Sequence, residues 1–197
     1  MQLLDGKALS TKIEKFRFTR AQKMITSPPL DKRDCYLGNA LLKKAGVKTA
    51  YTEAMIAEFS RCSEDIIYFV KTYCRIISLD FGEVPFKLYR YQEKMLIEAT
   101  RNRFSMFMLP RQMGKTQVIA AFMLHQIIFN PNYSIAILAN KDASSREVLD
   151  RVQFMFSLLP SWMQPGVVTW NKGDIKLDNG SKIFTAATSP SAIRGRS

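Results

Sequence analysis

Apolar and polar residues follow two different periods along the chain, which predict helices in some segments and strands in others. Apolar residues recur at helical spacing in five segments, which predict helices over 52–59, 63–77, 88–100, 117–129 and 144–159. Two short runs are continuously apolar, as in strands buried on both faces, and these are 105–109 and 134–139. The segments 174–177 and 182–184 flank Asp178-Asn179-Gly180-Ser181, and Asn-Gly between alternating runs predicts a β-hairpin. Strand, helix, strand and helix in succession predict an α/β fold with a parallel sheet covered by helices.

The character of these segments divides the chain into three regions. Residues 1–50 are rich in Lys and Arg and predict a basic N-terminal arm. Residues 51–85 hold the first two predicted helices, the second opening at Ser63 as an N-cap, and predict a small helical subdomain. Residues 86–197 hold the alternating strands and helices of the α/β domain.

Composition narrows the class of protein. With 197 residues, of which 47% are hydrophobic, the chain can bury one full core with a small addition. No apolar run approaches the roughly 20 residues needed to span a bilayer, and the N-terminus lacks the apolar segment of a signal peptide. The three cysteines show no C-x-x-C spacing and predict reduced, structural thiols; they are Cys35, Cys62 and Cys74.

The net charge of +12 is unevenly distributed. Residues 1–50 contain eleven Lys/Arg against four Asp/Glu. An excess of this size indicates a polyanionic partner such as nucleic acid. A solvated basic arm explains the same count, and the charge alone leaves both readings open.

The strongest chemical signal is the loop Arg111-Gln112-Met113-Gly114-Lys115-Thr116, which lies between a predicted strand and a predicted helix. Strand, tight turn, Gly-Lys-Thr and helix make a P-loop, whose backbone N–H groups wrap phosphates while the lysine neutralises them and the threonine holds Mg²⁺. The usual first glycine is absent, and Leu109 stands in its place. The alternative is an ordinary helix start with a solvated lysine, but the flanking segments favour nucleotide binding.

Other residues are weaker candidates. Tyr91 and Gln92 precede the loop by about twenty residues, as an adenine-reading pair does, although an amphipathic helix start explains them equally well. Arg111 can reach a phosphate or remain solvated. His125 is the only histidine and falls on the inner face of a predicted helix, where a core role is expected. The terminal basic tripeptide Arg194-Gly195-Arg196 can touch phosphates or simply be solvated.

Two runs, 82–92 and 111–116, resemble the large terminase subunit of tailed bacteriophages, whose phosphate loop has the same Arg-Gln-x-Gly-Lys-Thr/Ser form without the first glycine. Further segments are similar to the version found in large contractile-tailed phages. These are 137–141, 147–151, 158–160, 164–166, 170–173, 177–181 and 189–195. The resemblance covers residues 82–197 and is weak over 1–60.

The resemblance implies a P-loop NTPase of the RecA/ASCE-like type, a viral ATPase that uses ATP and Mg²⁺ to translocate DNA into a prohead. It implies adenine recognition by Tyr91 and Gln92, and Mg²⁺ binding by Thr116. It also implies phosphate binding by the loop, with Lys115 and Arg111 as catalytic residues. The loop residues in question are Arg111, Gln112, Met113, Gly114, Lys115 and Thr116. The implied partners are double-stranded DNA, the portal protein, the small terminase subunit and a second polypeptide carrying the C-terminal part of the terminase, with no membrane. The implied location is the host cytoplasm, transiently at the prohead portal.

The sequence departs from the family at its C-terminal end. In the family, a strand ending in the Walker B aspartate and the catalytic glutamate follows soon after an Arg-Gly that Arg194-Gly195 matches. No apolar strand ending in Asp-Glu lies between residues 117 and 197, and Asp174 and Asp178 in the predicted hairpin are poor substitutes. We therefore expect an incomplete sheet with an unpaired apolar edge, and negligible hydrolysis by the chain alone. A shortened chain, half of a split gene and a degenerate remnant all fit this pattern, and a split or partial gene product fits best.

Two other function classes stay open at this point. One is another ATP-driven nucleic-acid translocase or a helicase fragment, although helicases usually carry the complete glycine-rich loop. The other is a non-catalytic module that binds DNA or a protein partner and keeps only the fold.

Overall fold

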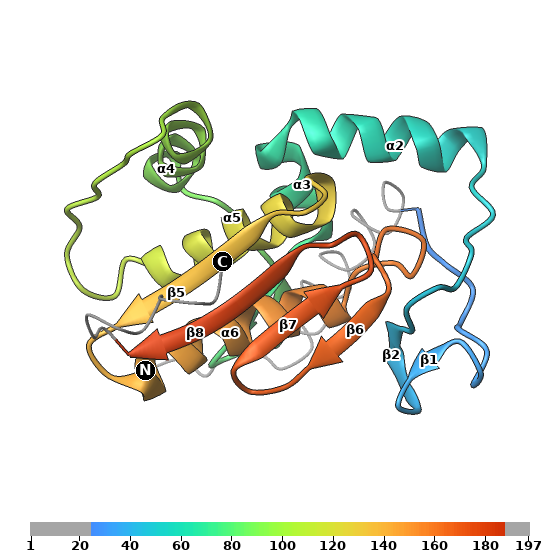
Figure 1. Cartoon of the computed structure of the whole chain (residues 1–197). Helices are drawn as coiled ribbons and strands as arrows, with labels where there is room; N and C mark the ends of the chain where they lie inside the picture. Colours follow the sequence, from blue (N-terminus) through green and yellow to red (C-terminus); the bar gives the residue numbers. More distant parts are fainter. Residues whose placement is uncertain (1–24, 188–197) are drawn as a thin grey trace, which may run out of the picture.

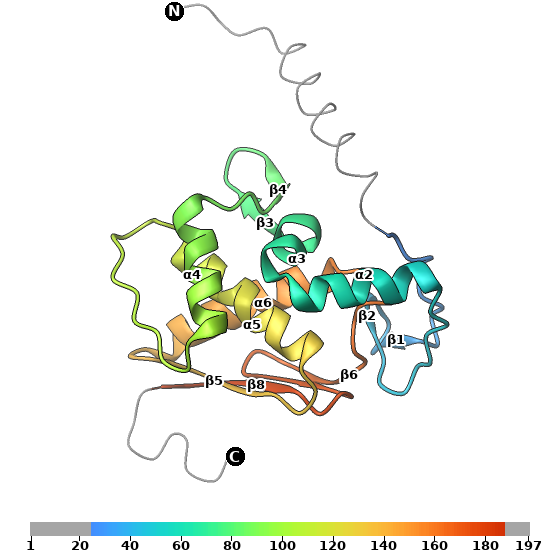
Figure 2. The ribbon, with the colours of Figure 1, turned by 90° about the horizontal axis from the view of Figure 1, so that it is seen from above.

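A computed structural model describes residues 25–187, in which helices lie on one side of a four-stranded sheet (Figures 1 and 2). The helices are α2 (Glu53–Glu64), α3 (Ile66–Tyr73), α4 (Arg90–Arg101), α5 (Lys115–Phe129) and α6 (Asp142–Ser157). The strands are β1 (Cys35–Tyr36), β2 (Asn39–Lys43), β3 (Arg75–Ser78), β4 (Gly82–Pro85), β5 (Ser134–Ala139), β6 (Val167–Trp170), β7 (Asp174–Leu177) and β8 (Lys182–Ala187). The α/β class is confirmed. None of the helices within 25–187 is long and apolar enough to cross a membrane.

The main sheet is mixed, with the strand order β5-β8-β7-β6. Only β5 and β8 are parallel, in the register Ser134↔Lys182 to Ala139↔Ala187. β7 pairs antiparallel with both β8 and β6. The hairpin predicted around Asn179-Gly180 is therefore confirmed, and Gly180 has the positive φ of 81° that such a turn requires. Of the expected parallel sheet, only the pairing of β5 with β8 is formed within the described residues.

The strand predicted over 105–109 is wrong. These residues connect α4 to α5 without regular structure, and they are mostly exposed: Met106 and Met108 are each 94% exposed. An apolar run becomes a buried strand only where neighbouring strands satisfy its N–H and C=O groups. Within residues 25–187, β5 is the outer strand of the sheet and pairs with β8 alone.

β5 forms with the predicted bounds, but only one of its faces is covered. Ile137 is buried, whereas Leu138 on the opposite face is 42% exposed. The prediction of a strand buried on both faces is wrong, because the described helices all lie on one side of the sheet (Figure 2).

The second predicted helix begins later and ends earlier than its pattern suggested. Thr52 caps α2 through its side-chain oxygen, which accepts from the N–H of Met55 at 3.3 Å, and Asp65 caps α3 in the same way. Ser63, the predicted N-cap, lies inside α2 and donates to the carbonyl of Ser60 at 2.8 Å. β3 and β4 form a hairpin where the helix was expected to continue, and Gly82 has a φ of 65° at its turn.

A single hydrophobic core joins the helices to the sheet. α6 packs on β5 and β8, and α5 packs on α6, so α5 is apolar almost all round. Phe69 of α3 makes edge contacts with the rings of His125 and Phe129 of α5. The three cysteines are buried and not in disulfides, in agreement with the predicted reduced thiols.

The described part of the N-terminal region packs against the segment after α6. Trp162 donates from Nε1 to the carbonyl of Ile25 at 3.0 Å, and Gln164 donates from Nε2 to the carbonyl of Leu41 at 3.0 Å. Residues 1–24, about half of the predicted arm, lie outside the described residues. The division at 50 and 85 remains a prediction.

Candidate nucleotide-binding site

The loop before α5 makes a tight turn with two left-handed residues. Gln112 has a φ of 64° and Gly114, the N-cap of α5, has a φ of 66°. A left-handed conformation costs a non-glycine residue about 1–2 kcal/mol, so its presence at Gln112 is a local strain. Turns of alternating handedness aim successive backbone N–H groups at one point, which is the geometry of an anion-binding nest.

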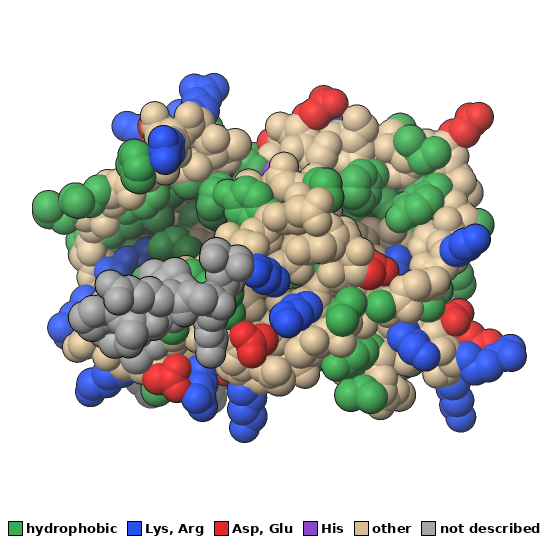
Figure 3. Space-filling model, in the orientation of Figure 1, with side chains coloured by type: hydrophobic (Ala, Val, Ile, Leu, Met, Phe, Trp, Pro, Cys, Tyr) green, Lys and Arg blue, Asp and Glu red, His purple; other side chains and the backbone are tan. Residues whose placement is uncertain are grey.

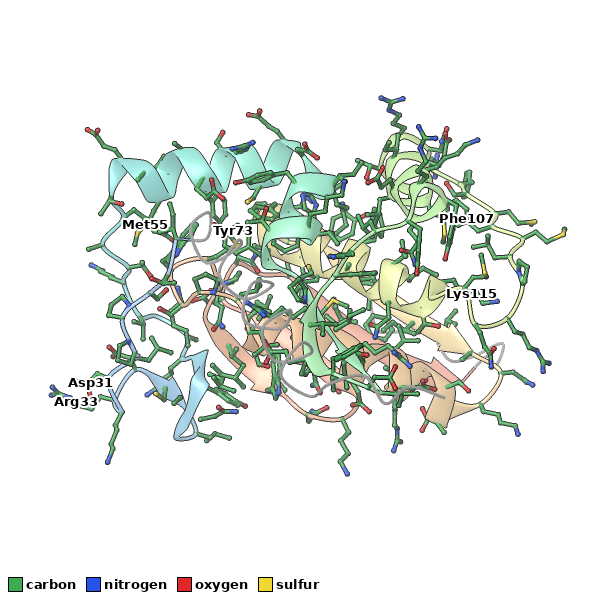
Figure 4. The ribbon with its side chains drawn as sticks, turned by 180° about the vertical axis from the view of Figure 1, so that it is seen from behind. Asp31, Arg33, Met55, Tyr73, Phe107 and Lys115 are labelled. Atoms are coloured by element: carbon green, nitrogen blue, oxygen red, sulfur yellow. The ribbon has the colours of Figure 1, made fainter. Side chains whose placement is uncertain are left out.

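Lys115 folds back over this turn. Its Nζ donates to the carbonyl of Leu109 at 3.4 Å, and the side chain is partly buried. Figure 4 places Lys115 beside the loop that joins α4 to α5, rather than extended into solvent. The ammonium group therefore closes a ring of main chain from Leu109 to Lys115.

The N-terminal end of α5 is electrostatically suited to an anion. α5 has 15 residues, and its first turn contains no acidic side chain. The unpaired N–H groups and the dipole of a helix favour negative charge at this end. The side-chain oxygen of Gln117, in the first turn of α5, is buried and has no hydrogen-bond partner within residues 25–187.

Tyr91 and Gln92 lie on α4 and bind the loop itself. The hydroxyl of Tyr91 donates to the carbonyl of Met113 at 2.8 Å, and Nε2 of Gln92 lies 3.3 Å from the same oxygen. Oε1 of Gln92 accepts from the backbone N–H of Tyr89 at 3.0 Å, at the start of α4. Gln92 is only 3% exposed, and the ring of Tyr91 stacks on that of Tyr89.

The structure brings part of the predicted site together. Tyr91 and Gln92 meet the turn at Met113 and Gly114, and Thr116 follows in the first turn of α5, partly buried. Arg111 and Gln112 are exposed. Figure 3 shows that the surface is hollowed below α4, with hydrophobic and basic side chains at the opening. The residues 194–196 lie outside the described residues.

Other titratable candidates take structural roles. His125 is buried, with Nε2 at 2.9 Å from the carbonyl of Cys62, and burial lowers the pKa of its imidazole. This is the core role that its position predicted. The carboxylate of Asp178 accepts from the backbone N–H of Gly166 at 2.7 Å and of Gly46 at 3.3 Å, so it fastens loops together.

Sequence reasoning did not find two participants in this site. The carbonyl of Leu109 holds the lysine, and the carbonyl of Met113 receives both side chains from α4. Main-chain acceptors leave no mark in a sequence.

A comparison with protein families gives one match over this region. Residues 106–197 match the family described as "Terminase large subunit, T4likevirus-type, N-terminal". The match covers just under half of the chain and includes the whole loop 111–116. It begins after Tyr91 and Gln92, whose assignment therefore still depends on the resemblance seen in the sequence.

Proposed function

Residues 106–197 belong to the N-terminal part of a terminase large subunit, and from this premise we propose that the chain is the ATP-binding portion of a DNA-packaging motor. In the complete protein this motor would hydrolyse ATP to translocate double-stranded DNA into a prohead. The observation that carries the proposal is the closed turn before α5, in which Gly114 is left-handed and Lys115 reaches the carbonyl of Leu109. A P-loop NTPase fold of the RecA/ASCE-like type is part of the same proposal.

The hydrogen-bond donors of this turn suit the phosphates of a nucleoside triphosphate. Backbone N–H groups at Gly114, Lys115 and Thr116 would bind phosphate oxygens, and the Lys115 ammonium would exchange the Leu109 carbonyl for the β- and γ-phosphates. The Thr116 hydroxyl would hold Mg²⁺, which supplies charge neutralisation at the phosphates when it is bound. Arg111, exposed at the rim, would reach toward the γ-phosphate.

The exposed linker supports the expectation that a further segment completes the domain. Phe104, Met106 and Met108 are 83%, 94% and 94% exposed, which is unusual for apolar side chains of this size. These three side chains alternate along the chain and would share one face of an extended segment, so a segment packed on that face would bury them. A second polypeptide with the C-terminal part of the terminase is the partner we propose for these exposed side chains. Residues 1–197 alone are then expected to bind ATP–Mg²⁺ weakly and to hydrolyse it negligibly.

The remaining partners are proposed on the family alone. They are the portal protein and the small terminase subunit, with the complete motor in the host cytoplasm and transiently at the prohead portal. The net charge of +12 agrees with a polyanionic partner such as DNA.

Calorimetric titration of the chain with ATP and Mg²⁺ tests the proposal. Lys115→Ala should weaken binding by at least about tenfold, because hydrogen bonds to charged groups contribute roughly 1.5–3 kcal/mol. Lys172→Ala is the matched control, since Lys172 is an exposed lysine in the turn between β6 and β7. Equal affinity of the two variants would contradict the assigned site. Rapid hydrolysis by the unmodified chain would contradict the expected need for a second polypeptide.

A further inference from the structure

The side chains of α4 hydrogen-bond to the phosphate loop at the carbonyl of Met113. It accepts two hydrogen bonds from side chains 21 and 22 residues earlier in the sequence: from Nε2 of Gln92 at 3.3 Å and from the hydroxyl of Tyr91 at 2.8 Å. Met113 immediately precedes Gly114, the N-cap of α5. The two bonds therefore act on the last peptide unit before the helix.

Peptide geometry transmits this contact to the other side of the turn. The peptide bonds of the described residues show no cis form. In a trans peptide the C=O and the following N–H lie in one plane and point in opposite directions. Fixing the Met113 carbonyl toward α4 therefore fixes the Gly114 N–H away from α4. That N–H is one of the donors assigned to phosphate above.

The packing leaves little freedom for another arrangement. A Cβ atom placed on Gly114 would lie 2.9 Å from Nε2 of Gln92, so the amide group and the turn are in close contact. Gln92 is also held at its other end, where Oε1 accepts from the N–H of Tyr89 at 3.0 Å. At 3% exposure, the side chain of Gln92 presents little surface to a ligand.

We propose that Tyr91 and Gln92 are positioning residues of the phosphate loop, which orient the Gly114 amide through the Met113 carbonyl and do not select the base. This inference depends on the proposed nucleotide site and changes the role of two of its residues. Loss of either contact should weaken binding of every ligand that carries a triphosphate, whatever its base. An adenine-reading pair would instead discriminate ATP from the others.

Tyr91→Phe separates the two roles, because it keeps the aromatic ring and removes only the hydroxyl that bonds Met113. Calorimetric affinities would be measured with Mg²⁺ for ATP, GTP and inorganic tripolyphosphate. A net hydrogen bond contributes about 0.5–1.5 kcal/mol, so we expect roughly twofold to tenfold weaker binding of all three ligands. Gln92→Ala should act in the same direction. Tyr89→Phe is the matched control, since it removes a hydroxyl from the neighbouring ring, which is 67% exposed.

The unfolding midpoint of each variant distinguishes positioning from a general loss of structure. For Tyr91→Phe we expect the midpoint to fall only by the small amount that the loss of one hydrogen bond causes, together with the weaker binding of all three ligands. Weaker binding of ATP alone, with tripolyphosphate unaffected, would overturn the inference and favour base recognition. Unchanged affinity for all three ligands would also overturn it. If the unmodified chain binds none of them, the nucleotide site itself is wrong, and the inference fails with it.

Discussion

Replacement of Glu58 by alanine should destabilise the helical layer that supports α5. Oε1 of Glu58 accepts hydrogen bonds from the hydroxyls of Tyr73 at 2.8 Å and Tyr68 at 2.9 Å, which joins α2 to α3. Tyr73, labelled in Figure 4, is 0% exposed, so its hydroxyl cannot turn to bulk water when the carboxylate is lost. Tyr68 is partly exposed and can bond water instead.

The magnitude follows from this difference in burial. A buried donor without its acceptor costs about 1–3 kcal/mol, and the solvent-accessible hydroxyl adds little. We therefore expect Glu58→Ala to lower the free energy of unfolding by about 2 kcal/mol. For a domain of this size the unfolding midpoint should fall by roughly 4–8 °C. Thermal unfolding followed by circular dichroism measures this directly.

A double-mutant cycle with Tyr73→Phe tests the reasoning. If the bond to Tyr73 carries most of the effect, Tyr73→Phe should cost little in the Glu58→Ala background, with a coupling of about 1 kcal/mol. Glu64→Ala removes an exposed carboxylate from the same helix and should stay within about 0.5 kcal/mol of the original chain. Strictly additive effects of the two changes would refute the assigned bond.

Two further changes should have measurable effects on stability. Gly180→Ala should lower the free energy of unfolding by about 1–3 kcal/mol, because φ is +81° and the new Cβ would clash with the side chain of Asn132. Gly173→Ala, whose Cβ meets nothing closer than 3.7 Å, is the control for denaturant unfolding. His125 has a pKa below its ordinary value of 6.5 because of burial, so its neutral form stabilises the fold fully above about pH 6.5 and less as the pH falls below that value. His125→Gln should therefore reduce the difference between unfolding midpoints at about pH 7 and about pH 5.5, and an unchanged difference would show that another group carries it.

Local signals explain which parts of the fold were predictable. β5 and the β7–β8 hairpin were predicted from an apolar run and from Asn-Gly, both of which act within a few residues. The segment 105–109 has a similar apolar composition but forms no strand in the described structure. Strand formation there depends on a neighbour, which a local pattern cannot supply.

The predicted start of the second helix was wrong for a different reason. Ser63 and Asp65 are both good N-cap residues, and they lie two positions apart. The choice depends on which start buries the following apolar residues. With Asp65 as the cap, Ile66, Phe69, Val70 and Tyr73 all face the core, which only the tertiary structure reveals.

The site combines one local signal with one long-range contact. Gly114 and Lys115 were predictable because the motif and the helix that follows are contiguous. The contact between Gln92 and the Met113 carbonyl joins two elements through packing, and the sequence suggested only that Gln92 belonged to the same site. That the Gln92 amide bonds main-chain groups through both its nitrogen and its oxygen could be seen only in the folded structure.

The segment between α4 and α5 has two parts, which differ in how firmly the rest of the structure holds them. The linker 102–110 is largely exposed, whereas the turn at Met113 is bonded to α4. α4 is in turn tied to α3 by the ion pair of Lys71 with Glu93 at 2.5 Å, and α5 is tied to α2 through His125. The turn can therefore keep its shape whatever the linker does. A partner that ordered the linker would add burial on one side of an already formed phosphate turn, and a displacement of α4 would alter that turn through a single carbonyl.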